Sequence, residues 1–190
     1  MLTIRRAMTL PVCTLAAVAL ALGGCKKVPN DATGTSANDE TTSETVGAAL
    51  GADGDLSSTE ALIRAADLDT TLNGPAPYTV FAPSNAALDA LPAEVVKTLK
   101  TPEAKPQLTS LLTGHIVPGT VTPGDIAKAI DAGGGRAALK TMAGDVLTFA
   151  KAGETITVAA PGGAATVIGS KPHQASNGVV YVIDGVLLRN

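Results

Sequence analysis

The sequence predicts an α+β domain, with short helices mainly in the first half and a sheet of short antiparallel strands in the second. Up to about residue 132, apolar residues follow helix caps at helical spacing. After Gly133-Gly134-Gly135 they form short β-rich runs separated by glycine. Two nearly continuous apolar runs, in residues 77–88 and 176–188, are typical of strands buried on both faces.

The first 24 residues have the pattern of a secretory signal. Arg5 and Arg6 give a basic start, residues 7–22 are apolar but too short to favour a membrane span, and small residues follow. The stretch ends in Leu22-Gly23-Gly24-Cys25, which resembles the lipobox of bacterial lipoproteins. That resemblance implies lipidation at Cys25 and cleavage before it. The alternatives are an ordinary signal peptide with an incidental cysteine and an uncleaved anchor helix.

Residues 25–44 predict a disordered tether between the lipid and the domain. They are small and polar, with Val28 as the one bulky apolar residue, so they cannot bury enough surface to offset the entropy of ordering. A tether of this length reaches about 25 Å on average and about 65 Å when stretched. Residues 45–190 then form one domain, which is long enough for a core of its own.

Charge and cysteine content restrict the partners. Removal of residues 1–24 takes away two arginines and no acid, which changes the formal net charge from −3 to −5. A mildly acidic domain is a poor ligand for nucleic acid, because such binding depends on cations that neutralise phosphates. Cys13 leaves with the signal and Cys25 is consumed by acylation, so we expect no disulfide and no free thiol.

Helix signals favour four or five short helices. Ser57-Ser58-Thr59-Glu60 has the form of a capping box, and Ser84 or Asn85 is suited to cap a second helix. Thr101-Pro102 and Thr122-Pro123 each place a cap before a proline at the first helical position. Pro106 interrupts the third region, so a helix is expected to restart there.

Strand signals predict an antiparallel meander in residues 136–188. The expected strands are residues 136–141, 146–150, 155–160, 164–169, 179–183 and 186–188. Gly144-Asp145, Ala152-Gly153 and Gly162-Gly163 are turn candidates between them. Residues 78–81 and 115–117 lie in the helical half, so we expect these two strands to pair with the sheet out of sequence order.

Four segments resemble the fasciclin (FAS1) domain family, in the order that the family has them. PYTVFAPSNAAL (77–88) and SNGVVYVIDGVLL (176–188) are similar to its two signature boxes. LLTGHIVPG (111–119) resembles its Tyr-His segment, and LKTMAGDVLTF (139–149) its Thr-Leu-x-Gly hairpin. The resemblance spans residues 45–190 and implies the FAS1 β-wedge with flanking helices.

The sequence departs from the family pattern at three motif positions. Gly114 replaces the tyrosine of the Tyr-His segment, and His173-Gln174 stands where an Asp-Ile pair is frequent. Tyr181 takes a place that many members give to histidine. The first two belong to motifs linked with integrin contact in animal members, so integrin binding is not transferred to this chain.

The resemblance selects ten motif positions, for which we expect structural roles. Ser84 and Asn85 are expected to cap a helix, Asn177-Gly178 to form a turn before a buried strand, and Asp184 to turn the last strand pair. An exposed rim would be the functional alternative for Ser84, Asn85 and Asn177. The ten positions are Thr79, Phe81, Pro83, Ser84, Asn85, His115, Asn177, Gly178, Tyr181 and Asp184.

The sequence predicts no catalytic residue, no metal site and no cofactor. There is no G-x-S-x-G elbow, and a lone His115 in an apolar segment is typical of a hydrogen-bonded core residue. A calcium loop that started at Asp53 would have Ser58 at its glycine position and Arg64 in place of the bidentate glutamate. Gly133-Gly134-Gly135 follows a helix end and has no lysine, which favours a helix C-cap over a phosphate loop.

These observations favour a non-catalytic interaction or adhesion module of the bacterial cell envelope. We expect a monomeric domain that binds an envelope protein or glycan, does not bind nucleic acid, and reaches the membrane through its lipid anchor. Lys26 follows Cys25 where an aspartate would resemble an inner-membrane retention signal, which favours the outer membrane, facing the periplasm or the surface. The alternative is a periplasmic small-ligand carrier or sensor with a pocket between helices and sheet.

Overall fold

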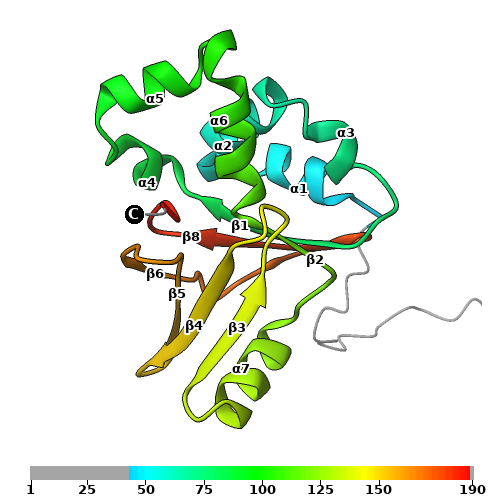
Figure 1. The fold of residues 1–190 in the computed structure, drawn as a ribbon. Helices are drawn as coiled ribbons and strands as arrows, with labels where there is room; N and C mark the ends of the chain where they lie inside the picture. The colour runs from blue at the N-terminus through cyan, green and yellow to red at the C-terminus, as the bar shows by residue number, and fades with distance from the viewer. Residues whose placement is uncertain (1–42, 189–190) are drawn as a thin grey trace, which may run out of the picture. The chain divides into compact units, whose positions relative to one another are not determined.

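The fold is given by a computed structural model that describes residues 43–188 (Figure 1). Its helices are α1 (Val46–Ala52), α2 (Ser57–Ala65), α3 (Asp69–Leu72), α4 (Asn85–Asp89), α5 (Ala93–Leu99), α6 (Lys105–Thr113) and α7 (Pro123–Ala132), with the 3₁₀ turns η1 (Gly54–Leu56) and η2 (Pro102–Ala104). Its strands are β1 (Tyr78–Pro83), β2 (Ile116–Pro118), β3 (Arg136–Lys140), β4 (Val146–Ala152), β5 (Thr155–Ala159), β6 (Ala165–Val167), β7 (His173–Ala175) and β8 (Gly178–Ile183). The predicted α+β class is confirmed.

The described strands form two four-stranded sheets. The first has the order β2-β1-β8-β7, and the second is the meander β3-β4-β5-β6. All pairs are antiparallel except β1 and β8, which run parallel in register from Tyr78↔Gly178 to Pro83↔Ile183. A bridge between Ile168 and Ile183 joins the two sheets. The parallel pair therefore unites two segments about a hundred residues apart in the chain.

Strands β1 and β8 are the centre of the domain, because each side of them carries its own apolar cluster. Alternate side chains of a strand point to opposite faces. Val80, Ala82 and Val180 pack against the N-terminal helices. Phe81 and Tyr181 face the other way, into a cluster with the second sheet and α7. Burial on both faces, which the apolar runs predict, is confirmed for both strands.

The start of α2 differs from the prediction. The capping box at residues 57–60 is not formed, because η1 runs directly into α2 and no side chain of this segment caps the helix. Thr59 instead donates its hydroxyl to the Pro83 carbonyl at 2.6 Å. Among the other predicted caps, Ser84 and Thr122 do cap α4 and α7, whereas Thr101 makes no cap bond to η2.

The strand and helix predictions need three corrections. The sheets are two rather than one, because β1 and β2 pair with β8 instead of the meander. Residues 186–188 form no strand, and β7 takes the edge beside β8. Helices α1, α3 and α5 were not predicted, and each spans no more than about two turns.

Candidate functional site

The first signature strand uses its motif residues for packing. Thr79 is fully buried, donates its hydroxyl to the Gly119 carbonyl at 2.7 Å and accepts from the Val121 N–H at 2.9 Å. The Phe81 ring stacks on Tyr181, with centroids 5.3 Å apart and planes 13° apart. Thr79 thereby fixes the loop after β2, and Phe81 fills the core between the two sheets.

The end of this strand organises two helix starts. Ser84 accepts a hydrogen bond from the first turn of α4 and caps it. Asn85 accepts from the Ser58 N–H at 2.9 Å and donates to the Gly54 carbonyl at 2.9 Å. Its amide therefore supplies, from a distant segment, the cap that α2 lacks locally. Pro83 lies buried just before these residues, as the last residue of β1.

His115 is buried with both ring nitrogens bonded to backbone. Nδ1 donates to the Leu111 carbonyl at 2.9 Å, and Nε2 accepts from the Leu187 N–H at 3.0 Å. Burial lowers the pKa of the imidazole from 6.5 to about 4, against a smaller opposing effect of the bond to Leu111. The ring is therefore neutral at pH 7, and neither nitrogen is open to act as a base or a metal ligand.

Asn177 ties the N-terminal helices to β8. Its Oδ1 accepts from the Val46 N–H at 2.7 Å, and its Nδ2 donates to the carbonyls of Leu72 and Gly74 at 2.8 and 2.7 Å. The next residue, Gly178, has φ +155°, and an added β-carbon would lie 1.8 Å from a backbone oxygen of β1. The three hydrogen bonds therefore explain asparagine at position 177, and the close approach of β1 explains glycine at position 178.

The last two motif positions bind backbone as well. The Tyr181 hydroxyl donates to the Val121 carbonyl at 2.8 Å, and burial raises the pKa of this phenol. The Asp184 carboxylate accepts from the Val167 N–H at 2.7 Å, which joins the end of β8 to β6. The structure thus places the polar motif groups in internal hydrogen bonds, and Ser84, Asn85 and Asn177 form no common site.

Other sequence-based expectations concern Cys25 and the metal-ligating residues. Cys25 and most of the proposed tether lie outside the described residues. Within residues 43–188 no group of three or more histidine, cysteine, aspartate or glutamate side chains is arranged to hold a metal ion. Asp53 accepts from the Asp55 N–H at 2.9 Å and contacts His173 Nε2 at 3.0 Å. None of the helices in this part of the chain is long and apolar enough to cross a membrane.

A hollow of about 540 Å³ lies beside α5. We call it the α5 groove. Helix α5 buries none of its residues, and Val95 is 42% exposed. Sequence reasoning missed this helix, although Pro92 before its first residue and Glu94 in its first turn were available signals. The groove is lined by Glu94, Val95, Thr98, Leu99, Thr101, Glu103, Ala104 and Gln107.

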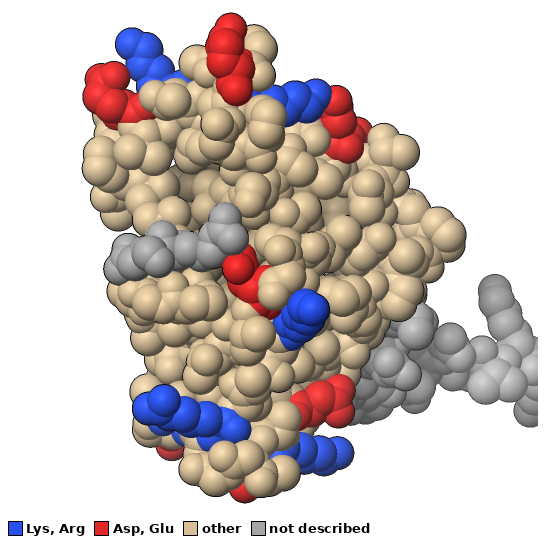
Figure 2. All heavy atoms as spheres, in the orientation of Figure 1, with Lys and Arg blue, Asp and Glu red and all other residues tan. Residues whose placement is uncertain are grey.

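Three smaller hollows are also present. One of about 270 Å³ lies between α6 and the second sheet, beside Gly114 and Leu147. Another, of about 370 Å³, lies between α7 and the edge of β5 and β6. A third, of about 340 Å³, lies on the far side of α5 from the α5 groove. In Figure 2, charged side chains gather at the helical end and over the opposite end near α7, with a mostly uncharged surface between.

Comparison with known proteins identifies a family that this chain matches. The model of the fasciclin domain matches residues 54–189. A search of solved structures finds the same fold in a FAS1 domain pair from the insect cell adhesion molecule Fasciclin I. The TM-score is 0.66 and the sequence identity 20%, over 77% of this chain and 51% of that one.

Three curated relatives share substantial sequence identity. Protein sll1483 of Synechocystis is 41% identical over 128 residues, which cover 67% of this chain and 64% of that protein. Cell surface glycolipoprotein MPB83 of Mycobacterium bovis is 40% identical over 64% of this chain and 48% of its own length. Transforming growth factor-beta-induced protein ig-h3 of Sus scrofa is 35% identical over 67% and 17%. The chain thus spans less than two thirds of each relative.

Proposed function

The chain belongs to the fasciclin domain family, and from this premise we propose that it is a non-catalytic adhesion-type module that binds protein or glycan partners in the cell envelope. The name of the solved structure describes a cell adhesion molecule, and that of MPB83 a cell surface protein. One observation on this chain supports the proposal. The polar groups of its signature motifs are bonded internally, so what remains for function is the outer surface.

The absence of a catalytic role is part of the same proposal. His115 is the histidine of the motifs, and its two nitrogens are bound to the backbone of Leu111 and Leu187. A general base needs a free nitrogen within reach of substrate. Reproducible turnover by the chain that His115→Ala abolished, in a variant that still folds, would contradict this proposal.

Anchoring at Cys25 completes the proposed arrangement. Leu22-Gly23-Gly24-Cys25 resembles a lipobox, and the two or three acyl chains that this implies hold a protein stably at a membrane. We place the chain at the outer membrane, facing the periplasm or the surface, with residues 25–44 as the tether. Labelling with radioactive palmitate, compared between the chain and Cys25→Ser, tests this. Equal label in both would contradict it.

The two hollows between layers are small for a carrier. Cofactor and ligand pockets typically span about 300–1,000 Å³ and enclose most of the ligand. The hollows at Gly114 and beside α7 measure about 270 and 370 Å³, near the lower end of that range, and the larger α5 groove lies along a helix that buries none of its residues. Binding of a partner across an open surface is therefore favoured over enclosure of a small molecule.

Affinity capture tests the proposed function. The purified chain serves as bait for detergent-solubilised envelope, and the captured material is analysed by mass spectrometry beside native mass spectra of the bait. Saturable recovery of one envelope protein or glycan supports the adhesion-type module. Recovery of no macromolecule, together with a small molecule that co-purifies with the bait, would support the carrier instead.

A further inference from the structure

Helix α5 separates two hollows of different chemistry. Residues 94, 95, 98 and 99 share one side of a helix, and residues 93, 96, 97 and 100 the other. The first set lines the α5 groove, and the second lines the hollow on the far side. The two adjacent valines thus face different hollows, Val95 the α5 groove and Val96 the other.

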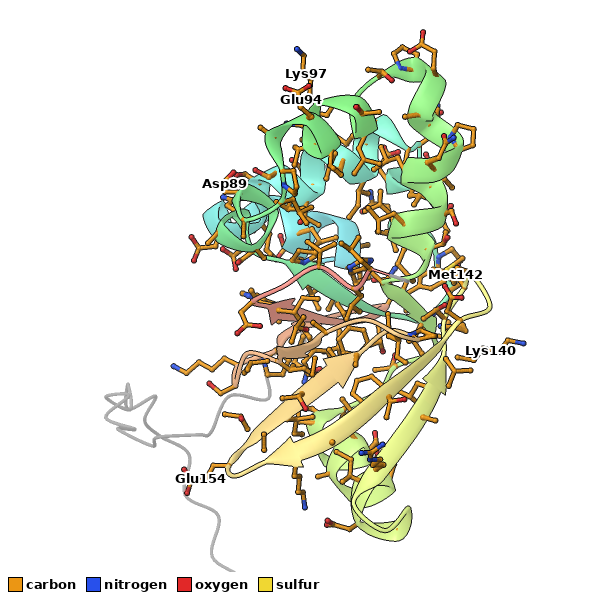
Figure 3. All side chains as sticks on the ribbon, turned by 60° about the vertical axis from the view of Figure 1, so that its left-hand side comes forward. Asp89, Glu94, Lys97, Lys140, Met142 and Glu154 are labelled. Carbon is orange, nitrogen blue, oxygen red and sulfur yellow. The ribbon has the colours of Figure 1, made fainter. Side chains whose placement is uncertain are left out.

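The charges divide in the same way. Glu94 and Glu103 are the charged residues that line the α5 groove, and neither forms an ion pair within residues 43–188. The far hollow instead holds Lys97 and Lys100 with Asp89. Figure 3 labels Glu94 and Lys97 on α5, and Asp89 on the neighbouring α4. The charged residues that line the α5 groove are therefore acidic only, and they have no ion-pair partner in the described part of the chain.

The apolar residues that line the groove differ in accessibility. Val95 is 42% exposed, Leu99 is half-buried, and Ala104 is buried, with 7% exposure. Burying such surface against another apolar side chain is favourable at about 25 cal/mol per Å². No aromatic residue lines the groove to stack on a sugar ring, and no cation lines it to hold an acidic glycan. The chemistry thus points to a polypeptide.

We propose that the α5 groove docks a segment of a partner protein in which an apolar side chain is flanked by lysine or arginine. This inference rests on the proposed function and names its surface and partner class. The apolar side chain enters beside Val95 and Leu99, and the flanking cations meet Glu94 and Glu103. The carboxylates orient the segment and disfavour acidic ones, because like charges across an interface are repulsive.

The test is an NMR titration of the full chain with three nine-residue peptides, GSKLKLKSG, GSKSKSKSG and GSELELESG. We expect saturable amide shifts within residues 93–107 for the first peptide alone. Glu94→Lys should weaken its binding about fivefold, and Val95→Ser by a similar factor. Asp89→Lys and Val96→Ser, which make the same changes on the far side of α5, should leave the affinity unchanged.

Three results would overturn the proposal. The first is equal binding of the lysine–serine peptide, and the second is equal weakening by Asp89→Lys, since either indicates general charge attraction. The third is a set of shifts that maps elsewhere. Repeating the envelope capture with Glu94→Lys separates this inference from the proposed function. If Glu94→Lys captures a partner as well as the unaltered chain does, the docking role of the groove is rejected and the proposed function stands. If the unaltered chain captures nothing, the proposed function itself is rejected.

Discussion

At the scale of single residues, the side chains that carry the family motifs bind backbone groups from distant segments. His115 joins the end of α6 to the C-terminal segment, and Asn177 joins β8 to α1 and α3. Buried polar groups of this kind cost free energy when they lose a partner. Their identity is therefore explained by hydrogen-bond geometry, without a ligand.

His115 predicts a loss of stability in mild acid. Its folded pKa of about 4 lies below the ordinary 6.5, so the unfolded chain binds more protons between these values. Stability is therefore present above pH 6.5 and falls with pH toward 4, by about 2 kcal/mol between pH 7.5 and pH 5. Urea unfolding at several pH values measures it. The His173→Gln variant should lose the same stability between pH 7.5 and pH 5 as the unaltered chain. If His115→Gln lost that stability as well, the pH dependence would not come from His115.

Asn177 predicts a large effect from a small truncation. Asn177→Ala leaves the Val46 N–H and the carbonyls of Leu72 and Gly74 without their partner. We expect the free energy of unfolding to fall by about 3 kcal/mol. Asn73→Ala, at an exposed asparagine, should cost less than about 1 kcal/mol. Equal losses in urea denaturation would show that the hydrogen bonds of Asn177 stabilise the fold no more than an exposed asparagine does.

At the scale of elements, the helices differ in what fixes them. Helix α7 has a complete capping box, in which Thr122 and Asp125 each bond the backbone of the other. Helix α2 depends on Asn85 from another segment, and α5 has neither a side-chain cap bond nor a buried residue. Local sequence determines the first case and tertiary contact the second, whereas α5 meets the core through the half-buried Leu99.

The cap of α7 predicts that one substitution changes both the stability of the fold and the pKa of Asp125. Hydrogen bonds from Thr122 lower the pKa of the Asp125 carboxyl. Thr122→Ala should cost about 1 kcal/mol in thermal or urea unfolding. It should also raise the pKa of Asp125 toward its ordinary value in an NMR titration. The exposed Thr120→Ala serves as the control, and an unchanged Asp125 pKa in Thr122→Ala would contradict the capping role.

Helix α5 predicts weak hydrogen-exchange protection. It has no buried residue, so its amides should exchange through local opening, well before those of β1 and β8. Native-state exchange followed by mass spectrometry or NMR checks this order. Protection of α5 equal to that of β8 would show that the helix opens only with the whole domain.

At the scale of the whole molecule, the parallel pair β1–β8 joins the helical half to the strand-rich half. Its two faces carry the two apolar clusters, so neither cluster can form fully without it. We expect the described helices and strands to unfold together as one cooperative unit.

Gly178 tests this dependence. A β-carbon there would overlap β1, so Gly178→Ala should cost more than about 4 kcal/mol and remove helical and strand signals together in circular dichroism. Gly119→Ala is the matched control. Gly119 also has positive φ, at +97°, but nothing lies within 4 Å of an added β-carbon, so the expected cost is only about 1 kcal/mol. Loss of strands with retention of helices in Gly178→Ala would contradict cooperativity.

The sequence by itself determined the α+β class, the first four strands of the meander, the buried signature strands and the caps at Ser84 and Thr122, because apolar period and cap chemistry are local properties. It did not determine the parallel pairing of β1 with β8 or the cap that Asn85 gives to α2, since partners so far apart leave no local signal. Nor did it predict the α5 groove. Only the tertiary structure shows that a seven-residue helix buries none of its residues and lies beside two glutamates that form no ion pair within residues 43–188, because exposure depends on what the rest of the fold covers.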